Sequence, residues 1–499
     1  MRPRYAFGLF AAFSLARALL VPAFELMPQS AYYFTYAEHP ALSYYDHPPM
    51  IGWLLWAGAV LFGKSALAVR GTVFVTTLAT QLAVYALGRR LLGEEAAGRA
   101  LVFLTASGVA LLLSFIAVPD VPLLLFWALS LLALERALFG GEGSSKNWLP
   151  WLLTGTAMGL AFLSKYTGVF LQGGLVLFLL ASPGHRRLLR TPKPWLALAV
   201  AQVVSLPVWI WNLRHDFASF AFQLGGRAAE SRFDPDDALG FLASQAAVLL
   251  PVGFGLFVWV VGKRTVQAVR KRGAIDPQEL FLLAFALPLF ATCIALSTLT
   301  WVKVNWPMPA YLSGLLLVAP AVGRRATAWQ AGLGGALLLA AAVQLVYYPV
   351  RVGSNDTWWG WRELAAEAEA LHESHPDRFL FSGDNYKTTA ELRFYTDLPV
   401  YGMNVIGWNA LQYDYIGEDL SELVGRDAFL IQEEEKLRPS ERTERYLLRT
   451  RLYFESVEEV EPIELRHRGD VTRLFRVFDC RNYRGPHLPI PRELYSPER

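Results

Sequence analysis

Long apolar runs alternate with short polar loops along the first 350 residues of the chain. A helix that crosses a lipid bilayer needs roughly 20 consecutive, mostly apolar residues. The runs that approach this length cover residues 5–24, 66–87, 100–118, 121–138, 148–164, 168–182, 195–211, 241–262, 279–298, 306–322 and 327–349. This pattern predicts a polytopic α-helical membrane protein with about 11–13 transmembrane helices.

Two apolar stretches need a separate interpretation. The first run follows Met1-Arg2-Pro3-Arg4, as a signal peptide would, but it contains Arg17 and lacks a small-residue cleavage site. We therefore expect a retained first helix. Residues 51–61 are apolar but too few to cross a bilayer, which favours a helix lying in the membrane interface.

The density of charged residues changes sharply after residue 350. Residues 1–350 contain 41 of the 89 Asp, Glu, Lys and Arg residues, whereas the shorter stretch 351–499 contains 48. This step predicts a transmembrane domain at 1–350 and a separate C-terminal domain at 351–499. In the C-terminal domain, residue periodicity predicts strands at 378–381, 399–401, 427–431 and 472–478 and helices at 386–395 and 441–450.

The C-terminal domain is therefore expected to be a small α/β domain. Its sequence contains neither a Gly-rich phosphate-binding loop nor the spacing of metal ligands. We expect it to cover a site in the membrane domain rather than to hold an active site of its own.

Composition supports the membrane assignment and excludes other classes. Hydrophobic residues make up 54 % of the chain, and the mean hydropathy is +0.30, which is too apolar for an ordinary soluble protein. A net charge of +3 does not favour a nucleic-acid partner. Cys293 lies in an apolar run and Cys480 in the polar domain, so no disulfide framework is expected.

The basic residues predict the orientation of the chain. Alternate loops, beginning with the N-terminus, carry eighteen Lys and Arg residues, whereas the opposite set carries seven. Because short cytoplasmic loops are enriched in Lys and Arg, the N-terminus is expected in the cytoplasm. An odd number of spans then places the C-terminal domain outside, together with the first outside loop at 25–65. The predicted location is a bacterial cytoplasmic (inner) membrane.

Polar and ionisable residues gather in the outside loops. Asp46 lies in the first outside loop, and Asp120 lies between two prolines in the second. A carboxylate at a membrane boundary is typical of a cavity that also holds a partner. We predict Asp46 as the leading catalytic carboxylate and Asp120 as the second. For Asp46, the expected partner is His47 or an outside cation.

The same loops supply candidate substrate-binding residues. Lys165, Arg214 and Lys303 are candidates to hold a phosphate or pyrophosphate, because cations stabilise such a group as it leaves. The predicted substrate-binding set also contains the aromatic residues Tyr32, Tyr33 and Trp306, which could stack on a sugar, and the polar residues His47, His215, Asn305 and Arg17. Arg17 lies roughly 10 Å inside its span, at about 1.5 Å per residue. It needs an anionic partner there, either a loop carboxylate or a lipid phosphate.

The loop motifs resemble a known family of membrane enzymes. The string Tyr44-Tyr45-Asp46-His47-Pro48-Pro49-Met50, preceded by Ala31-Tyr32-Tyr33, is similar to the first outside loop of bacterial members of the dolichyl-phosphate-mannose protein mannosyltransferase family. The resemblance continues through Pro119-Asp120-Val121-Pro122-Leu123, Leu163-Ser164-Lys165-Tyr166, Trp211-Asn212 with His215-Asp216, Lys303 with Asn305-Trp306-Pro307, Gly360-Trp361-Arg362-Glu363-Leu364 and Glu391-Leu392-Arg393-Phe394-Tyr395. These enzymes form part of the GT-C class of glycosyltransferases, which also contains the aminoarabinose transferase that acts on lipid A.

The resemblance implies a function and its partners. A GT-C enzyme of this family transfers a sugar from a polyprenyl-phosphate donor to a glycolipid, polysaccharide or protein acceptor. The reaction takes place on the extracytoplasmic face, with inversion at the anomeric carbon and a first-loop carboxylate as general base. The expected partners are the lipid-linked donor, the bilayer and the acceptor, and no nucleic acid. No cofactor is assigned with certainty, and a divalent cation is the one alternative.

One departure from the family pattern affects the mechanism. The family carries an Asp-Glu pair just before Ala31, and its first member is the favoured base, but this chain has Gln29 and Ser30 there. Neither side chain accepts a proton as a base at neutral pH. Three interpretations follow: Asp46 or Asp120 is the base, the acceptor is acidic enough to need none, or the chain binds a lipid-linked sugar without transferring it.

Two rival functions belong to other classes. A non-catalytic binder or transporter of a lipid-linked sugar would place polar groups near the midplane of its spans, whereas here they lie almost wholly at one face. A receptor for a soluble ligand, with the C-terminal domain as its sensor, ranks third.

Overall fold

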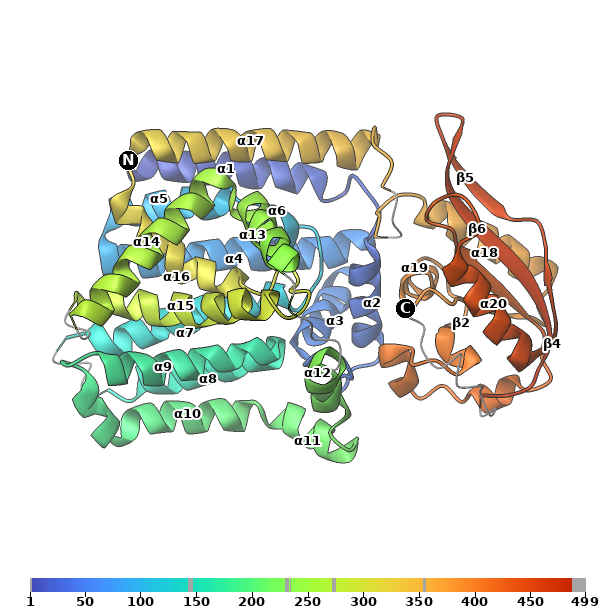
Figure 1. Cartoon of the computed structure of the whole chain (residues 1–499), viewed down its shortest axis with the longest axis horizontal. Helices are drawn as coiled ribbons and strands as arrows, with labels where there is room; N and C mark the ends of the chain where they lie inside the picture. Colours follow the sequence, from blue (N-terminus) through green and yellow to red (C-terminus); the bar gives the residue numbers. More distant parts are fainter. Residues whose placement is uncertain are drawn as a thin grey trace.

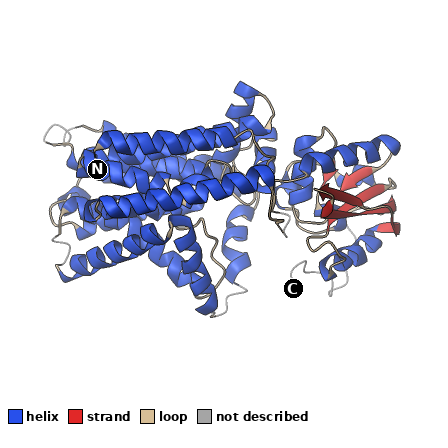
Figure 2. Cartoon of the chain, turned by 90° about the horizontal axis from the view of Figure 1, so that it is seen from above, coloured by secondary structure: helices blue, strands red, loops and turns tan. Residues whose placement is uncertain are grey.

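The computed structural model consists of a helical bundle and a smaller α/β domain at one end of it (Figure 1). The N-terminus lies at the opposite end of the bundle, and the view from above shows the same arrangement (Figure 2). The structure describes residues 2–141, 147–228, 233, 235–271, 275–352 and 356–486.

The bundle contains seventeen described helices, several of them short or broken. They are α1 (Pro3–Leu20), α2 (Pro28–Glu38), α3 (Met50–Phe62), α4 (Ala66–Leu92), α5 (Glu94–Thr105), α6 (Gly108–Leu113), α7 (Asp120–Phe139), α8 (Leu149–Ser164), α9 (Val169–Ala181), α10 (Pro192–Val204), α11 (Leu206–Arg214), α12 (Ala218–Ala228), α13 (Pro235–Leu249), α14 (Pro251–Arg270), α15 (Pro277–Ser297), α16 (Met308–Val318) and α17 (Arg324–Tyr347).

Fewer of these helices can cross a membrane by themselves than the sequence predicted. Among the described residues, five helices are long and apolar enough, namely α4, α7, α14, α15 and α17. The pair α10 and α11, bent by 45°, makes a sixth if it is counted as one span. The remaining predicted runs are helical, but their helices are too short or too polar to meet the same measure.

Three predicted spans, 100–118, 195–211 and 241–262, are wrong as single helices. The run 241–262 is divided between α13 and α14, and the backbone of Leu250 adopts a positive φ of 64° at the break. Pro251 explains the break, because a proline lacks the backbone N–H and disfavours helical geometry in the residue before it.

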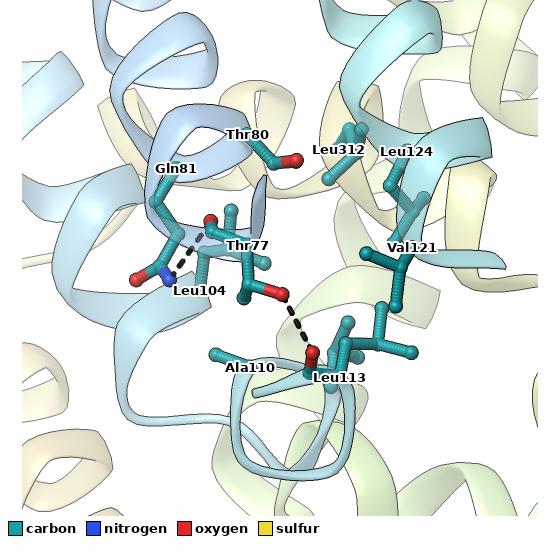
Figure 3. Close-up of a pocket in the computed structure, with 10 residues that line it drawn as sticks. Thr77, Thr80, Gln81, Leu104, Ala110, Leu113, Val121, Leu124 and Leu312 are labelled. Carbon is teal, nitrogen blue, oxygen red and sulfur yellow. Dashed lines mark hydrogen bonds between the residues drawn. The ribbon is translucent and has the colours of Figure 1, made fainter. Parts of the chain in front are cut away.

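Helix α6 shows how a short helix is stabilised inside the bundle. Thr77 Oγ1 on α4 donates a hydrogen bond of 2.7 Å to the carbonyl of Leu113, the last residue of α6 (Figure 3). Arg17 Nη1 on α1 donates one of 2.9 Å to the carbonyl of Ala110. Lipid offers no hydrogen-bond donors, so these side chains replace the donors that a longer helix would supply. α6 leads into the loop before Asp120, and its position therefore affects the site.

Helices α2 and α3 lie where the bundle meets the C-terminal domain. α3 matches the interfacial helix predicted at 51–61. α2 runs across the end of the bundle, between it and the C-terminal domain (Figure 1). The sequence analysis treated the segment of α2 as part of a loop, since Pro28–Glu38 is too short and too polar for a span.

The C-terminal domain is a mixed sheet with helices packed on it. Its elements are α18 (Trp361–Ser374), β1 (Phe379–Phe381), α19 (Lys387–Tyr395), β2 (Val400–Tyr401), β3 (Ala428–Glu433), α20 (Glu441–Tyr453), β4 (Phe454–Glu459), β5 (Ile463–His467) and β6 (Asp470–Tyr483). The strand order is β2-β1-β3-β6-β4, with β5 also paired to β6. β1 runs parallel to β2 and β3, whereas β6 is antiparallel to its three neighbours. Four strands and two helices lie where the sequence predicted them.

Two tail motifs dock this domain on the bundle. The carboxylate of Glu25, just before α2, accepts hydrogen bonds from the backbone N–H groups of Trp361 (2.6 Å) and Arg362 (3.2 Å) at the start of α18. A carboxylate is favourable there because a helix N-terminus carries unpaired N–H groups and partial positive charge. The backbone N–H of Leu26 donates to the hydroxyl of Tyr395 on α19 at 2.8 Å. Direct polar contacts thus join the first outside loop to the C-terminal domain.

Candidate active site

Asp46 is buried between α2 and α3, at the end of the bundle that faces the C-terminal domain. The residue is 6 % exposed, and its Oδ1 accepts hydrogen bonds from the hydroxyls of Tyr32 (2.8 Å) and Tyr36. Gln223 Nε2 on α12 donates to the backbone carbonyl of Asp46 at 2.5 Å. Two tyrosines of α2 therefore fix the carboxylate, and α12 fixes the backbone of the same residue.

The surroundings of Asp46 make it a stronger base than an ordinary aspartate. Burial raises the pKa of Asp46, while the hydroxyls of Tyr36 and Tyr32 and the charge of Lys303 offset part of that increase. A carboxylate whose pKa lies closer to neutral pH accepts a proton more readily while still being ionised. The expected outside cation is thus present, as Lys303, but the hydrogen bonds to Oδ1 come from tyrosines.

Asp120, the first residue of α7, forms the second carboxylate cluster. Its Oδ1 and Oδ2 lie 2.9 and 3.0 Å from Lys165 Nζ, and Asn305 Nδ2 donates to Oδ2 at 2.6 Å. Asp120 is 1 % exposed and Lys165 8 %. The sequence analysis named all three residues separately, and the structure brings them together from the start of α7, the end of α8 and the loop before α16. The ammonium group of Lys165 faces the carboxylate of Asp120, which gives it a structural partner in addition to its predicted contact with phosphate.

Tyr33 lies within electrostatic range of both carboxylates. Burial raises the pKa of Tyr33 well above its ordinary value, and the charges of Asp46, Tyr386 and Asp120 raise it further. Both carboxylates therefore act on the same buried hydroxyl. His47 packs on Tyr33 with ring centroids 5.7 Å apart.

The structure corrects the role expected for Tyr32. Tyr32 is a candidate for stacking on a sugar by its sequence, but the residue is 2 % exposed, its hydroxyl bonds Asp46, and its ring lies 4.6 Å from that of Tyr386. Tyr33, 8 % exposed, is similarly covered, whereas Trp306 is half-buried. Of the three aromatic candidates, Trp306 alone keeps much surface for a ligand.

Arg214 and His215 lie outside the two carboxylate clusters. His215 stacks on Trp211 with ring centroids 4.0 Å apart, and Tyr415 of the C-terminal domain packs against both rings. Arg214, at the end of α11, is exposed. Within the described ranges, neither residue makes a hydrogen bond or ion pair with Asp46 or Asp120. A contact of these residues with substrate stays a prediction.

The expected anionic partner of Arg17 is not a carboxylate. Arg17 is 1 % exposed and donates to the carbonyls of Phe13 and Ala110 and to Ser114 Oγ, at 3.2, 2.9 and 3.3 Å. The alternative of an ion pair with a loop carboxylate is therefore wrong. The guanidinium instead bonds the carbonyl of Ala110 and the hydroxyl of Ser114 near the end of α6 and so supports the loop before Asp120.

Gln29 and Ser30, which stand where the family that the chain resembles carries an Asp-Glu pair, have defined contacts. Gln29 Nε2 donates to Oδ1 of Asp356 at 2.6 Å, and Ser30 Oγ accepts a hydrogen bond of 3.0 Å from the backbone N–H of Ala117. Ser30 thereby fixes the loop before Asp120 to α2. Gln29 contacts the C-terminal domain.

Sequence reasoning missed several residues of the site. Tyr36, Gln223, Tyr386 and Asp356 all contact it or its edge. Tyr36 lies four residues after Tyr32, on the same helix face, so periodicity within α2 was a usable signal for this residue. The other three come from distant segments and leave no local signal.

No group of three His, Cys, Asp or Glu residues that could hold a metal ion is found in the described part of the chain. The site combines two buried carboxylates with the cations Lys165 and Lys303. It can therefore accept a proton and stabilise a negatively charged leaving group.

Comparisons with known proteins agree with this arrangement. The family model described as Dolichyl-phosphate-mannose-protein mannosyltransferase matches residues 46–211, which contain both carboxylates. The crystal structure of ArnT from Cupriavidus metallidurans bound to undecaprenyl phosphate superposes with a TM-score of 0.63, at 15 % identity, over 96 % of this chain and 98 % of that one. The chain has the GT-C fold. The predicted fold class and the predicted resemblance are confirmed.

Two further proteins are similar to this chain over most of its length. ArnT from the same organism in the apo state superposes with a TM-score of 0.61, at 16 % identity, over 95 % of this chain and 97 % of that one. The lipid A galacturonosyltransferase RgtD of Rhizobium johnstonii is 29 % identical over 412 residues, which are 79 % of this chain and 83 % of the relative.

Proposed function

We propose that the chain is a glycosyltransferase that moves a sugar from a polyprenyl-phosphate donor to a glycolipid acceptor, with inversion at the anomeric carbon. The observation that carries the proposal is the buried Asp46, held by two tyrosine hydroxyls beside the Asp120 cluster and the charge of Lys303. The comparisons support the same enzyme class. RgtD is named a lipid A galacturonosyltransferase, which suggests galacturonate or a related sugar as the transferred group and lipid A as the acceptor. ArnT binds undecaprenyl phosphate in one structure, which suggests undecaprenyl phosphate as the carrier of the donor sugar.

The proposed mechanism uses groups of the chain alone. Asp46 removes the proton from the acceptor hydroxyl while the hydroxyl oxygen attacks the anomeric carbon on the face opposite the phosphate. The bond between that carbon and the phosphate oxygen breaks, and the phosphate leaves on its lipid. Positioned cations such as Lys303 stabilise the charge of the leaving phosphate. The Asp120–Lys165–Asn305 cluster holds the surrounding loops together.

No step of this mechanism requires a cofactor. The proposal therefore includes none, and a divalent cation remains the alternative. Adding a chelator to the purified enzyme should leave sugar transfer unchanged if no metal is needed and should abolish it if a divalent cation is needed.

The direct test is sugar transfer by the purified chain. Reconstituted protein is mixed with lipid A and with undecaprenyl phosphate carrying either galacturonate or a neutral hexose, and the lipids are analysed by mass spectrometry. The proposal requires an added sugar on lipid A that depends on the chain. If the donor binds but is not consumed with any of the acceptors tested, the chain is a non-catalytic binder or a transporter.

Lys303 provides a prediction about the donor. Replacing it by alanine should weaken binding of undecaprenyl phosphate by about tenfold, since one charge-assisted contact contributes about 1.5 kcal/mol. Lys303→Arg should retain part of the affinity because the positive charge remains. Titration of the purified variants with undecaprenyl phosphate measures the effect. Equal affinity in all three proteins would leave Lys303 as an interfacial lysine without a role in donor binding.

We also propose that the chain lies in a bacterial cytoplasmic membrane, with the N-terminus inside and the C-terminal domain outside. Cys293 and Cys480 are buried, so they give little background for cysteine labelling. An impermeant thiol reagent should label a cysteine at the exposed position Ser421 in intact spheroplasts and should not label one at the exposed position Lys271. The reverse pattern would contradict the proposed orientation.

A further inference from the structure

A carboxylate from the C-terminal domain contacts the position where the family carries its first carboxylate. Gln29 lies in the first turn of α2, and its Nε2 donates to Oδ1 of Asp356 at 2.6 Å. The two residues are 327 positions apart in the sequence. The chain thus lacks an acid at position 29 but holds one within hydrogen-bond distance of it.

Asp356 is more accessible than either carboxylate of the bundle. Its Oδ2 lies 2.9 Å from Nζ of Lys387, the first residue of α19. The side chain of Asp356 is 43 % exposed, whereas that of Asp120 is 1 % exposed and Asp46 is buried. A molecule that approaches from the side of the C-terminal domain can therefore touch Asp356 directly.

A short series of contacts places Asp356 at the edge of the candidate active site. Tyr386 precedes Lys387, and its ring lies 4.6 Å from that of Tyr32. The hydroxyl of Tyr32 in turn donates to Asp46. Burial raises the pKa of Tyr386, and the charges of Asp356 and Asp46 raise it further, so both carboxylates act on one hydroxyl.

We propose that Asp356, together with Gln29 and Lys387, binds hydroxyl groups of a carbohydrate acceptor and supplies from the C-terminal domain the acceptor-contacting carboxylate that the chain lacks at position 29. Carboxylate oxygens accept hydrogen bonds from hydroxyl groups, and an ammonium group donates hydrogen bonds that a sugar oxygen can accept. Neighbouring donors and acceptors of this kind match the adjacent hydroxyls of a sugar. The inference rests on the proposed function and narrows its acceptor to a carbohydrate group.

Stability alone does not account for this ion pair. A half-exposed pair contributes roughly 0–1 kcal/mol, and the C-terminal domain already docks through Glu25 and Tyr395. Tyr395→Phe is therefore the matched control, because it removes an interdomain hydrogen bond at a residue that does not contact Asp356 or Lys387 in the described structure.

Binding of lipid A to the purified full chain tests the inference without requiring turnover. Asp356→Asn should raise the Kd for lipid A at least tenfold, while the Kd for undecaprenyl phosphate changes less than twofold and Tyr395→Phe leaves both unchanged. Adding Gln29→Asp to Asp356→Asn should restore lipid A binding, because the carboxylate returns at the neighbouring position. In transfer assays, the single variant Asp356→Asn should have a higher KM for the acceptor and an unchanged kcat.

Several outcomes would overturn the inference. One is an unchanged Kd for lipid A in Asp356→Asn. Another is an equal loss of lipid A affinity in Tyr395→Phe, which would indicate that Asp356 acts through domain docking. A third is a lower kcat with an unchanged acceptor KM in Asp356→Asn, which would make Asp356 the base. The wild-type chain could bind lipid A, with weaker binding in Asp356→Asn, and still transfer no sugar. That result would refute the proposed function but not the inference about Asp356.

Discussion

Replacing Asp46 by asparagine is expected to lower the turnover number of sugar transfer by a factor of about 100 or more, as is typical for loss of a positioned base. Oδ1 of Asp46 accepts hydrogen bonds from Tyr32 and Tyr36. The amide oxygen of asparagine can keep both bonds, so the fold and donor binding should change little. The second oxygen becomes an NH₂ group, which cannot take a proton from the acceptor.

The pH dependence of transfer gives a second measure of the same residue. Asp46 must be ionised to act as a base, and burial raises its pKa. The activity of the wild-type enzyme should therefore fall as the pH drops through a value above the ordinary 3.8 of an aspartate. This acid limb should disappear in the residual activity of Asp46→Asn.

Asp120→Asn is the matched comparison for Asp46→Asn. If Asp46→Asn turns over normally and Asp120→Asn is inactive, Asp120 is the base. Normal turnover in both variants would mean that neither carboxylate is the base, and the interpretation of an acidic acceptor would replace the proposed mechanism.

Lys165→Met should lower the free energy of unfolding by about 3–5 kcal/mol, because it leaves the carboxylate of Asp120 buried without its countercharge. Lys165 Nζ lies within 3.0 Å of both carboxylate oxygens. Methionine keeps a side chain of similar length, so the change tests charge more than packing. Unfolding of the purified protein in detergent, followed by tryptophan fluorescence, measures the loss.

The double variant Lys165→Met/Asp120→Asn separates a structural role from a role in substrate binding. It removes both charges, so most of the lost stability should return. Wild-type stability in the single variant would contradict the structural role. If Lys165 instead holds the donor phosphate, the single variant should bind undecaprenyl phosphate more weakly, and the added Asp120→Asn should not repair that defect.

The helices of the bundle were predictable in position but not in continuity. The runs at 66–87, 121–138, 279–298 and 327–349 match α4, α7, α15 and α17 closely. The break at Leu250 had a local signal in Pro251, whereas the break between α5 and α6 had none as strong. The end of α6 depends on Thr77 and Arg17, which bond the carbonyls of Leu113 and Ala110 from other helices.

The sheet of the C-terminal domain shows a similar limit. β3 and β6 have enough apolar residues to predict strands, but the sequence analysis missed β4 and β5. β4, Phe454–Glu459, contains three glutamates and is largely exposed, so alternation of apolar and polar residues hardly marks it. β5, Ile463–His467, has a single buried residue, Leu465. Pairing with β6 makes both of them strands.

The sequence by itself determined the membrane class, the chemistry of the outside loops and the importance of Asp46 and Asp120 as candidates. Hydrophobicity over about 20 residues is a local property of the chain, and the first-loop motif is contiguous. Only the tertiary structure decided the partners of each polar group. Asp120 meets Lys165 and Asn305, and Gln29 meets Asp356, across 45, 185 and 327 residues. A buried polar group is stabilised by whichever donor or acceptor the fold brings to it, and no local pattern specifies that partner.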